Sequence, residues 1–205
     1  MAFTYFFRDM ATLEALQRHA VPHLRGRMHI HIWDAGCAIG AEPYSLAMVL
    51  REAFGPFHFR NVRIHATDID TTGEFARAIA EATYPAEAIR RIPPQFFTRY
   101  FTPAPHKPAH FTIKDELRRA VAFHRHDLLS LRPIRTGLDL VVCKNVLLHF
   151  HEGQRAAVVR MFAEALAHGG FLAFEQTQGL PAGTEGLFQR VTPEAQLFRK
   201  VADPR

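Results

Sequence analysis

The part of the sequence best suited to hold a ligand is residues 33–45, which read Trp-Asp-Ala-Gly-Cys-Ala-Ile-Gly-Ala-Glu-Pro-Tyr-Ser. Gly36 and Gly40 let the backbone approach a bound molecule where a Cβ would clash, and Pro43 suits the first turn of a helix because it lacks an N–H. The spacing matches neither the dinucleotide motif Gly-x-Gly-x-x-Gly nor a phosphate-binding loop ending in Gly-Lys-Ser/Thr. Glu42 lies where a phosphate-binding helix keeps its amino end open for anions. The pattern predicts a nucleotide-cofactor pocket whose ligand is cationic or zwitterionic near Glu42.

Polar residues also follow three other predicted strands, at Asp68, at Asp127 and at Lys144-Asn145. An open parallel sheet binds its ligand outside the carboxyl ends of its strands, so these positions have priority. Asp68 is placed to hydrogen-bond a ribose diol, with an exposed turn acid or a helix N-cap as the alternative. Asp127 is a candidate acceptor for an adenine amine, with a turn residue as the alternative.

Three further side chains have candidate roles at this edge, each beside a plainer one. Glu42 can bind an ammonium group or serve the helix dipole as a first-turn acid, and the two roles are compatible. Arg8 can grip a carboxylate in a bidentate manner or be a surface residue. His149 can position a substrate or simply cap or pack at a strand end.

The elements that must position these residues follow from the spacing of apolar side chains. Strands and helices alternate, which is the α/β pattern, and the last two strands are expected to form an antiparallel edge. The fold predicted is α/β, a doubly wound and mostly parallel sheet. Helices are predicted over 10–23 ending at Pro22, over 43–54 ending at Gly55-Pro56, from Phe75 onward, and over 154–166 with a left-handed cap from Gly169 and Gly170. Strands are predicted over 29–33, 62–67, 121–123, 138–143, 171–174, 187–191 and 196–201.

Between Tyr84 and Arg119 the pattern changes, because six prolines interrupt short apolar pieces. The segment 84–119 is therefore expected to be an inserted subdomain packed against the main sheet. The whole chain, 1–205, is expected to be one catalytic domain.

Composition narrows the class of protein further. The chain has 205 residues, 48% of them hydrophobic, and no apolar run long enough to span a bilayer, so one soluble domain without membrane insertion is expected. The N-terminal segment lacks the basic-then-apolar layout of a secretory signal, which favours a cytoplasmic location. In that reducing compartment, Cys37 and Cys143 would be free thiols. No Cys/His spacing indicates zinc, so no metal is expected.

The formal net charge is +5, carried mostly by arginines spread along the chain. A diffuse excess of this kind is usually solvated surface, although it can attract an acidic protein partner or nucleic acid. Nucleic-acid binding is not expected, because no basic stripe with interleaved aromatic residues occurs. The oligomeric state is open.

Five segments resemble the CheR-type chemoreceptor glutamate methyltransferases, in order and over almost the whole chain. They are Phe-Phe-Arg-Asp at 6–9, Asp-Ala-Gly-Cys-Ala-Ile-Gly-Ala-Glu-Pro-Tyr-Ser-Leu-Ala-Met at 34–48, Ala-Thr-Asp-Ile-Asp at 66–70, Arg-Tyr-Phe at 99–101, and Cys-Lys-Asn-Val-Leu-Leu-His-Phe at 143–150. The resemblance implies a class I fold that binds S-adenosylmethionine, releases S-adenosylhomocysteine and methylates glutamate side chains of an acceptor protein, in particular the cytoplasmic region of a chemoreceptor.

The resemblance also implies roles for individual residues. Thr4 and Arg8 would touch the cofactor, Glu42 would bind its methionine amino group, and Asp68 its ribose. Its adenine side would meet Asp127 and Leu128, and Cys143, Lys144 and Asn145 would complete the pocket. Gly36 joins these cofactor-binding candidates on its own chemistry, because a glycine lets the backbone approach the ligand. Arg8 and His149 are the candidate catalytic residues.

The sequence departs from the family pattern at several points, which include Ala2 in place of a polar residue and Glu-Gln-Thr-Gln at 175–178 in place of Gly-His-Ser-Glu. Met1 stands almost against the Phe-Phe-Arg motif, which predicts a short form lacking the family's N-terminal helical domain. Lys144 replaces an arginine and so offers a point charge rather than a planar fork. His149 replaces a tyrosine. Two alternative functions stay open: methylation of another carboxylate or a small molecule, and a non-catalytic module that binds S-adenosylmethionine.

Overall fold

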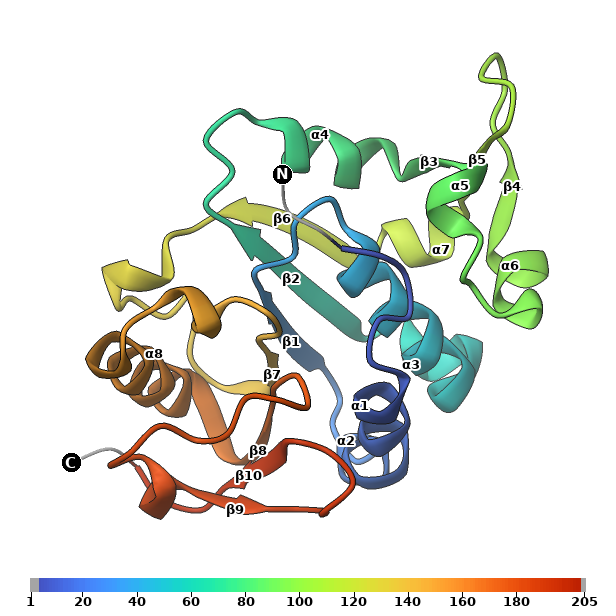
Figure 1. Ribbon diagram of the computed structural model, residues 1–205. Coiled ribbons are helices and arrows are strands. Elements are labelled where there is room, and N and C mark those ends of the chain that lie inside the picture. The colour runs from blue at the N-terminus through green and yellow to red at the C-terminus, as the bar shows by residue number, and fades with distance from the viewer. Residues whose placement is uncertain (1–3, 204–205) are drawn as a thin grey trace.

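A computed structural model describes residues 4–203, and its centre is a seven-stranded sheet in the order β6-β2-β1-β7-β8-β10-β9 (Figure 1). The first five of these strands pair in parallel, whereas β10 pairs antiparallel with both β8 and β9. The predicted mostly parallel sheet with an antiparallel edge is confirmed. The strands are β1 Ile30–Ala35, β2 Val62–Asp68, β6 Val121–Arg125, β7 Leu138–Val142, β8 Leu166–Ala173, β9 Phe188–Arg190 and β10 Leu197–Lys200.

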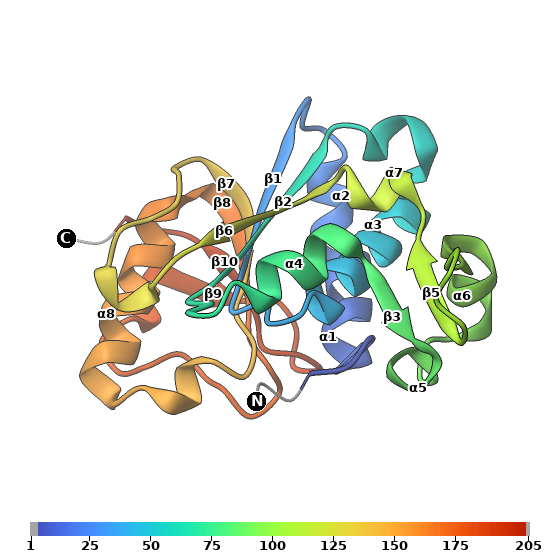
Figure 2. The same cartoon turned by 90° about the horizontal axis from the view of Figure 1, so that it is seen from above.

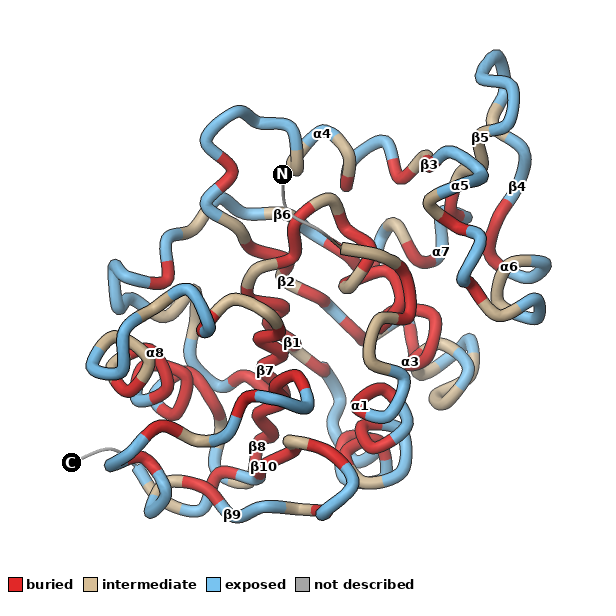
Figure 3. Tube along the Cα trace, in the orientation of Figure 1, coloured by how far each residue is buried: buried red, intermediate tan, exposed pale blue. Residues whose placement is uncertain are grey.

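Helices cover both faces of this sheet (Figure 2). Side chains of β1 alternate between two apolar clusters, since Ile30 and Ile32 pack with the helices at the start of the chain and with α3, whereas Trp33 packs with α8. The strands between the helix layers form the buried centre (Figure 3). The helices of the main body are α1 Met10–Ala15, a π-helical turn Leu16–Ala20, α2 Val21–Leu24, α3 Ala41–Phe59, α4 Glu74–Glu81 and α8 Glu152–Ala165.

The strand order reverses between β1 and β7, because the chain runs outward through β2 and β6 before it returns to β7 on the other side of β1. At such a switch point the connections leaving neighbouring strands diverge and leave a crevice at the carboxyl ends. The segments that follow β1 and β7 therefore frame the natural ligand site of this sheet.

The segment predicted as an insert contains a second sheet, of three antiparallel strands in the order β3-β5-β4. Phe6 links this small sheet to the main body, because its ring lies 4.9 Å from that of Tyr84 and 5.9 Å from that of Phe101. We propose that this unit is an inserted subdomain. Its elements are β3 Thr83–Pro85, α5 Ala86–Ile89, α6 Pro94–Tyr100, β4 Phe101–Pro103, β5 His110–Ile113 and α7 Asp115–Arg118.

Two predicted helix ends are wrong. Helical backbone continues past Pro22 to Leu24, because Pro22 falls in the first turn of α2, where its missing N–H costs little. Helix α8 ends at Ala165 and passes directly into β8, so Gly169 and Gly170 lie in that strand and do not cap the helix. Gly169 does have a left-handed φ of 75°, but at an irregularity in the pairing of β8 with β7.

Other boundaries shift by a few residues. Helix α3 starts at Ala41, two residues before Pro43, and bends at Gly55, whose φ of 76° and ψ of 170° are not helical. Across the described residues, no helix combines the length and apolar character needed to cross a membrane.

Candidate active site

A cavity of about 650 Å³ lies at the carboxyl edge of the sheet. Ten of the eleven predicted site residues line it, from the N-terminal segment and from the segments that follow β1, β2, β6 and β7. These are Thr4, Arg8, Gly36, Glu42, Asp68, Asp127, Leu128, Lys144, Asn145 and His149.

Glycine is required in the turn after β1. Gly36 has a φ of 99°, and a Cβ there would lie 2.1 Å from Cγ2 of Val146. Gly40 has a φ of 95°, and a Cβ there would lie 2.8 Å from the hydroxyl oxygen of Tyr84. Both positions therefore exclude side chains by backbone conformation and by space, and the turn brings backbone up to the cavity at Gly36.

Glu42, in the first turn of α3, forms a buried ion pair with Lys144. Nζ of Lys144 lies 3.0 Å from Oε2 of Glu42, and the two side chains are only 2% and 12% exposed. The same Nζ donates to the carbonyl oxygen of Arg8 at 3.1 Å. Burial disfavours the charged lysine, but the attraction of Glu42 outweighs it and leaves the pKa of Lys144 above its usual value.

The buried carboxylates hold unused hydrogen-bonding capacity. Oε1 of Glu42 and both carboxyl oxygens of Asp34 are buried without a hydrogen-bond partner. Burial, followed by the neighbouring charge of Glu42, raises the pKa of Asp34 well above its usual value. The raised pKa favours the neutral form of Asp34, so this second carboxyl adds no full charge beside Glu42. Lys144 then neutralises Glu42 from one side and leaves Oε1 free to accept from a second cation.

Asp68 holds the glycine turn in place at the cavity wall. Its Oδ2 accepts from the N–H of Ala38 at 2.9 Å, and its Oδ1 accepts from that of Ile69 at 2.8 Å. The carboxylate thus joins the end of β2 to the glycine turn after β1 and still lines the cavity. An ionised carboxylate has lone pairs left after two such bonds, so Asp68 can also accept from a ligand diol.

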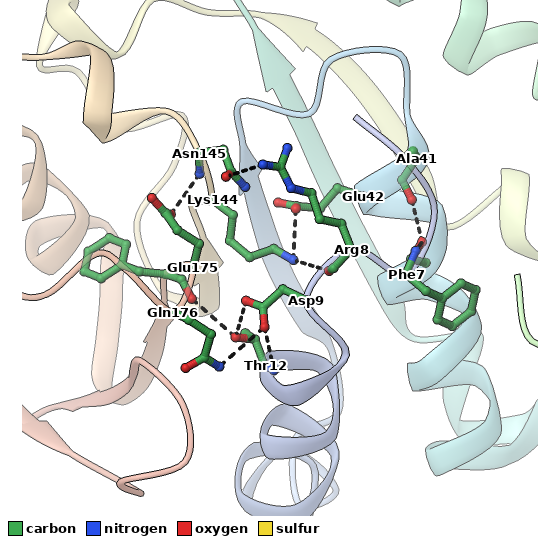
Figure 4. A network of polar contacts seen from close by, with 12 residues as sticks. Phe7, Arg8, Asp9, Thr12, Ala41, Glu42, Lys144, Asn145, Glu175 and Gln176 are labelled. Atoms are coloured by element: carbon green, nitrogen blue, oxygen red, sulfur yellow. Dashed lines mark hydrogen bonds and ion pairs between the residues drawn. The ribbon is translucent and has the colours of Figure 1, made fainter. Parts of the chain in front are cut away.

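The N-terminal segment is tied across the site by side chains from distant parts of the sequence (Figure 4). Nη2 of Arg8 donates to Oδ1 of Asn145 at 2.7 Å, and the N–H of Asn145 donates to Oε2 of Glu175 at 2.8 Å. Asn145 has a left-handed φ of 58°, a conformation that asparagine tolerates better than most residues. The N–H of Phe7 donates to Oγ of Ser45 at 2.8 Å and fixes the same segment to α3.

The far end of the cavity is more apolar. Asp127 caps a 3₁₀ turn, Leu128–Ser130, by accepting from the N–H of Leu129 at 2.9 Å, so its plainer predicted role is observed. Leu128 and Leu129 line the cavity together with Ile69. Apolar side chains beside a single carboxylate suit a flat aromatic ring with an exocyclic amine.

His149 lies in a second 3₁₀ turn, Leu147–His149, as an exposed side chain at the cavity. It reaches the same cavity as Arg8, as does the exposed Leu148. Arg8 and His149 are therefore brought together at one site, although they are far apart in the sequence.

Cys143 is the predicted site residue that does not line the cavity. Its side chain is wholly buried in the apolar cluster under α8, and burial raises the pKa of its thiol well above the usual range. Reasoning from sequence also missed Asp34, although an acid at the end of a buried apolar strand is a signal in itself. Glu175 and Leu129 were missed as well, because no motif or spacing in the sequence marks either residue as part of a site.

The site combines a buried anionic end, a carboxylate at its middle and an apolar end. This donor set fits S-adenosylmethionine, because the orphaned Oε1 of Glu42 can take the ammonium, Asp68 the ribose, and the leucines with Asp127 the adenine. Among the described residues, no group of three His, Cys, Asp or Glu side chains is arranged to hold a metal ion.

Comparison with known proteins agrees with this fit. Residues 2–196 match the family model described as CheR methyltransferase, SAM binding domain. The chain is 32% identical over 169 residues to the chemotaxis protein methyltransferase of Listeria monocytogenes, covering 82% of this chain and 61% of that protein. It is 29% identical over 183 residues to chemotaxis protein methyltransferase 2 of Vibrio cholerae, covering 86% and 62%. The chain thus spans about three fifths of these relatives.

Among solved structures, the chain is similar to a possible exported protein from Bordetella parapertussis. The TM-score is 0.51 at 16% identity, over 92% of this chain and 49% of that one. This likeness concerns the fold alone. Together with the family match, the sheet order and its antiparallel edge confirm the class I methyltransferase fold expected from the sequence.

Proposed function

The chain belongs to the CheR methyltransferase family, and from this membership we propose that it transfers the methyl group of S-adenosylmethionine to glutamate side chains of an acceptor protein. The observation that carries the proposal is the unpartnered Oε1 of Glu42, buried beside Lys144 at the edge of the cavity. A buried acceptor left without a donor costs free energy unless a ligand satisfies it. The ammonium of an amino-acid end is such a ligand.

The residues at the site have distinct tasks in this reaction. Glu42, with Asp34 behind it, holds the ammonium, while Asp68 holds the ribose and the side chains of Leu128 and Leu129 enclose the adenine. When bound, S-adenosylmethionine supplies an electrophilic methyl group on a sulfonium. No residue has to act as a base, because a glutamate carboxylate is already ionised at neutral pH.

The remaining task is to orient the acceptor and remove water from it. Arg8 can grip a carboxylate with its planar guanidinium, and its bond to Asn145 fixes where the guanidinium lies. His149, exposed at the same cavity, can donate a hydrogen bond to the acceptor's second oxygen. We propose a chemoreceptor region in the cytoplasm as the acceptor, since the named relatives are chemotaxis methyltransferases.

Tritiated methyl transfer to receptor-containing membranes tests this proposal. The expected result is label on a protein that mild alkali releases, as it does from a methyl ester. Alkali-stable label, or label only on small molecules, would contradict it. If S-adenosylmethionine binds in calorimetry while no acceptor of any kind is labelled, the chain is a non-catalytic binding module.

The ribose role of Asp68 has its own test. We expect Asp68→Ala to weaken S-adenosylmethionine binding by about 1–3 kcal/mol, the scale of a lost hydrogen bond in a buried polar site. Unchanged affinity in calorimetry would refute that role.

A further inference from the structure

The amino ends of the parallel strands form a basic face opposite the candidate active site. Arginines precede or begin three neighbouring strands, β1, β2 and β6. The two segments that lead into β1 and β2, residues 25–29 and 56–63, contain four arginines and no Asp or Glu. The positive charge that looks diffuse along the sequence is therefore gathered in space. The arginines of this basic face are Arg25, Arg27, Arg60, Arg63, Arg118 and Arg119.

Hydrogen bonds hold the two segments side by side. The N–H of Ile30 donates to the carbonyl oxygen of Asn61 at 3.0 Å, at the point where β1 and β2 begin. Nη2 of Arg25 donates to the carbonyl oxygen of Ala53 in α3 at 2.7 Å. Figure 2 shows the segment before β1 projecting beyond the strand ends, next to the end of α3 and near α7.

The charge on this face is only partly neutralised. Nε of Arg27 lies 3.5 Å from Asp139, and Arg118 and Arg119 share Asp115 at 3.1 and 4.0 Å. Arg25 and Arg63 instead donate to backbone carbonyl oxygens, which carry no net charge. The face therefore keeps a positive excess.

Two large apolar side chains stand out from the same face. Met28 and Phe57 are each 79% exposed, more than any other large hydrophobic residue that the structure describes. The guanidinium carbon of Arg60 lies 5.5 Å from the centre of the Phe57 ring. Each apolar side chain is thus flanked by arginine, in one of the two basic segments.

We propose that this basic face, with Met28 and Phe57 at its tip, binds the surface of a bilayer that contains anionic phospholipids. Arginines next to such a surface are attracted by the lipid phosphates, and flanking apolar side chains gain by entering the boundary with the acyl chains. A projecting convex tip suits a deformable lipid surface, whereas an extended acidic peptide needs a groove. This orientation leaves the mouth of the active site facing away from the bilayer.

Vesicle sedimentation tests the proposal without using methyl transfer. The full chain is mixed with vesicles of 30% phosphatidylglycerol in phosphatidylcholine, or of phosphatidylcholine alone, at 0.05 and 0.5 M salt. We expect binding to the anionic vesicles only, and its loss at high salt, where screening shortens the reach of the charges. Binding to both lipids alike, or to neither, overturns the proposal.

Variants locate the contact. The double variant Arg60→Ala/Arg119→Ala should bind about tenfold or more weakly, since each arginine near an anionic surface contributes roughly fivefold. Phe57→Ser should weaken binding about tenfold. The matched controls, Arg77→Ala/Arg90→Ala and Leu131→Ser, remove equal charge or an exposed leucine elsewhere and should bind like the unaltered chain.

Equal losses in the test and control variants overturn the assignment to this face. Polyglutamate serves as a second probe. If it binds in place of the vesicles, and Phe57→Ser leaves that binding unchanged, the partner is an acidic polypeptide and the lipid proposal is wrong.

Discussion

Nζ of Lys144 lies 3.0 Å from Oε2 of Glu42, so the acid expected to receive the cofactor's ammonium already holds one lysine. The pair is buried, and Asp34 lies behind it as a further carboxyl with a raised pKa. With Asp34 in its neutral form, Lys144 balances the charge of Glu42, but Oε1 of Glu42 still has no hydrogen-bond donor. A ligand ammonium supplies that donor, so cofactor binding and the stability of this cluster are linked.

Replacing the lysine should therefore destabilise the ligand-free protein. In Lys144→Met, Glu42 and Asp34 lose their buried cation, and the free energy of unfolding should fall by about 3–5 kcal/mol, the scale for removing one partner of a buried ion pair. S-adenosylhomocysteine, which carries the same ammonium, should raise the melting temperature of the variant more than that of the unaltered chain. The exposed Lys114→Met is the control, and equal melting temperatures of the two variants would contradict the account.

Arg8 should affect turnover more than stability. Arg8→Lys keeps the positive charge but loses the planar fork that a carboxylate can bind with two bonds. We expect kcat for methyl transfer to fall about tenfold or more with little change in melting temperature. Arg91→Lys is the matched control, because both guanidinium groups contact the Tyr5 ring and Arg91 does not line the cavity. A rate for Arg8→Lys equal to that of Arg91→Lys would remove Arg8 from the mechanism.

The turn after β1 should not tolerate a side chain at Gly36. Gly36→Ala introduces a Cβ 2.1 Å from Val146 at a φ of 99°, so the turn must move. We expect a loss of about 2 kcal/mol or more in unfolding free energy, from strain and overpacking, together with weaker cofactor binding. Gly26→Ala is the control, since a Cβ there meets nothing within 4 Å and φ is not positive. If denaturant unfolding of the two variants coincides, the turn is more adaptable than the structure indicates.

Stability should decrease in mild acid because of His65. Burial, then the charges of His31, Arg135, His124 and Arg63, lowers the pKa of His65 to about 4 from 6.5. The unfolded chain takes up this proton near pH 6.5 and the folded chain only near pH 4. Stability is therefore unaffected above about pH 6.5, falls as the pH is lowered toward 4, and loses nothing more from this group below that.

Because His65 is only half-buried, solvent screens part of this effect. The free energy of unfolding should therefore fall by about 1–2 kcal/mol between pH 6.5 and pH 4. Urea unfolding at pH 7 and at pH 4.5 should show a smaller difference for His65→Gln than for the unaltered chain. His168→Gln, at an exposed histidine, should keep the full difference. An unchanged pH dependence in His65→Gln would show that other groups cause the acid sensitivity.

Much of the fold was predictable because periodicity is local. The alternation before Gly36 and the helical spacing after Pro43 are written in neighbouring residues, and the strand order then brings Glu42, Asp68 and Asn145 to one edge. The helix ends predicted at Pro22 and at Gly169 and Gly170 were wrong, because the structural role of a proline or a glycine depends on its tertiary context. Proline fits the first turn of a helix as well as its end, and a left-handed glycine serves a strand irregularity as well as a cap.

The pairings inside the site could not be predicted from spacing. Nothing local indicates that Lys144 turns toward Glu42, or that Asp34 lies against the same carboxylate, because strand pairing and burial decide both contacts. Cys143 shows the converse, since it adjoins Lys144 in the sequence but points to the other face of the sheet, into the cluster under α8. Neighbouring residues at a strand end alternate between the two faces.

The most direct test of the account is the binding of two ligands to Glu42→Gln. Calorimetry compares S-adenosylhomocysteine with 5′-methylthioadenosine, which has the adenine and ribose but no ammonium. We expect the variant to bind S-adenosylhomocysteine about tenfold to a hundredfold more weakly, the scale of a lost charged hydrogen bond, and methylthioadenosine as tightly as the unaltered chain does. Equal weakening of both ligands, or of neither, would contradict the claim that Glu42 receives the cofactor's ammonium.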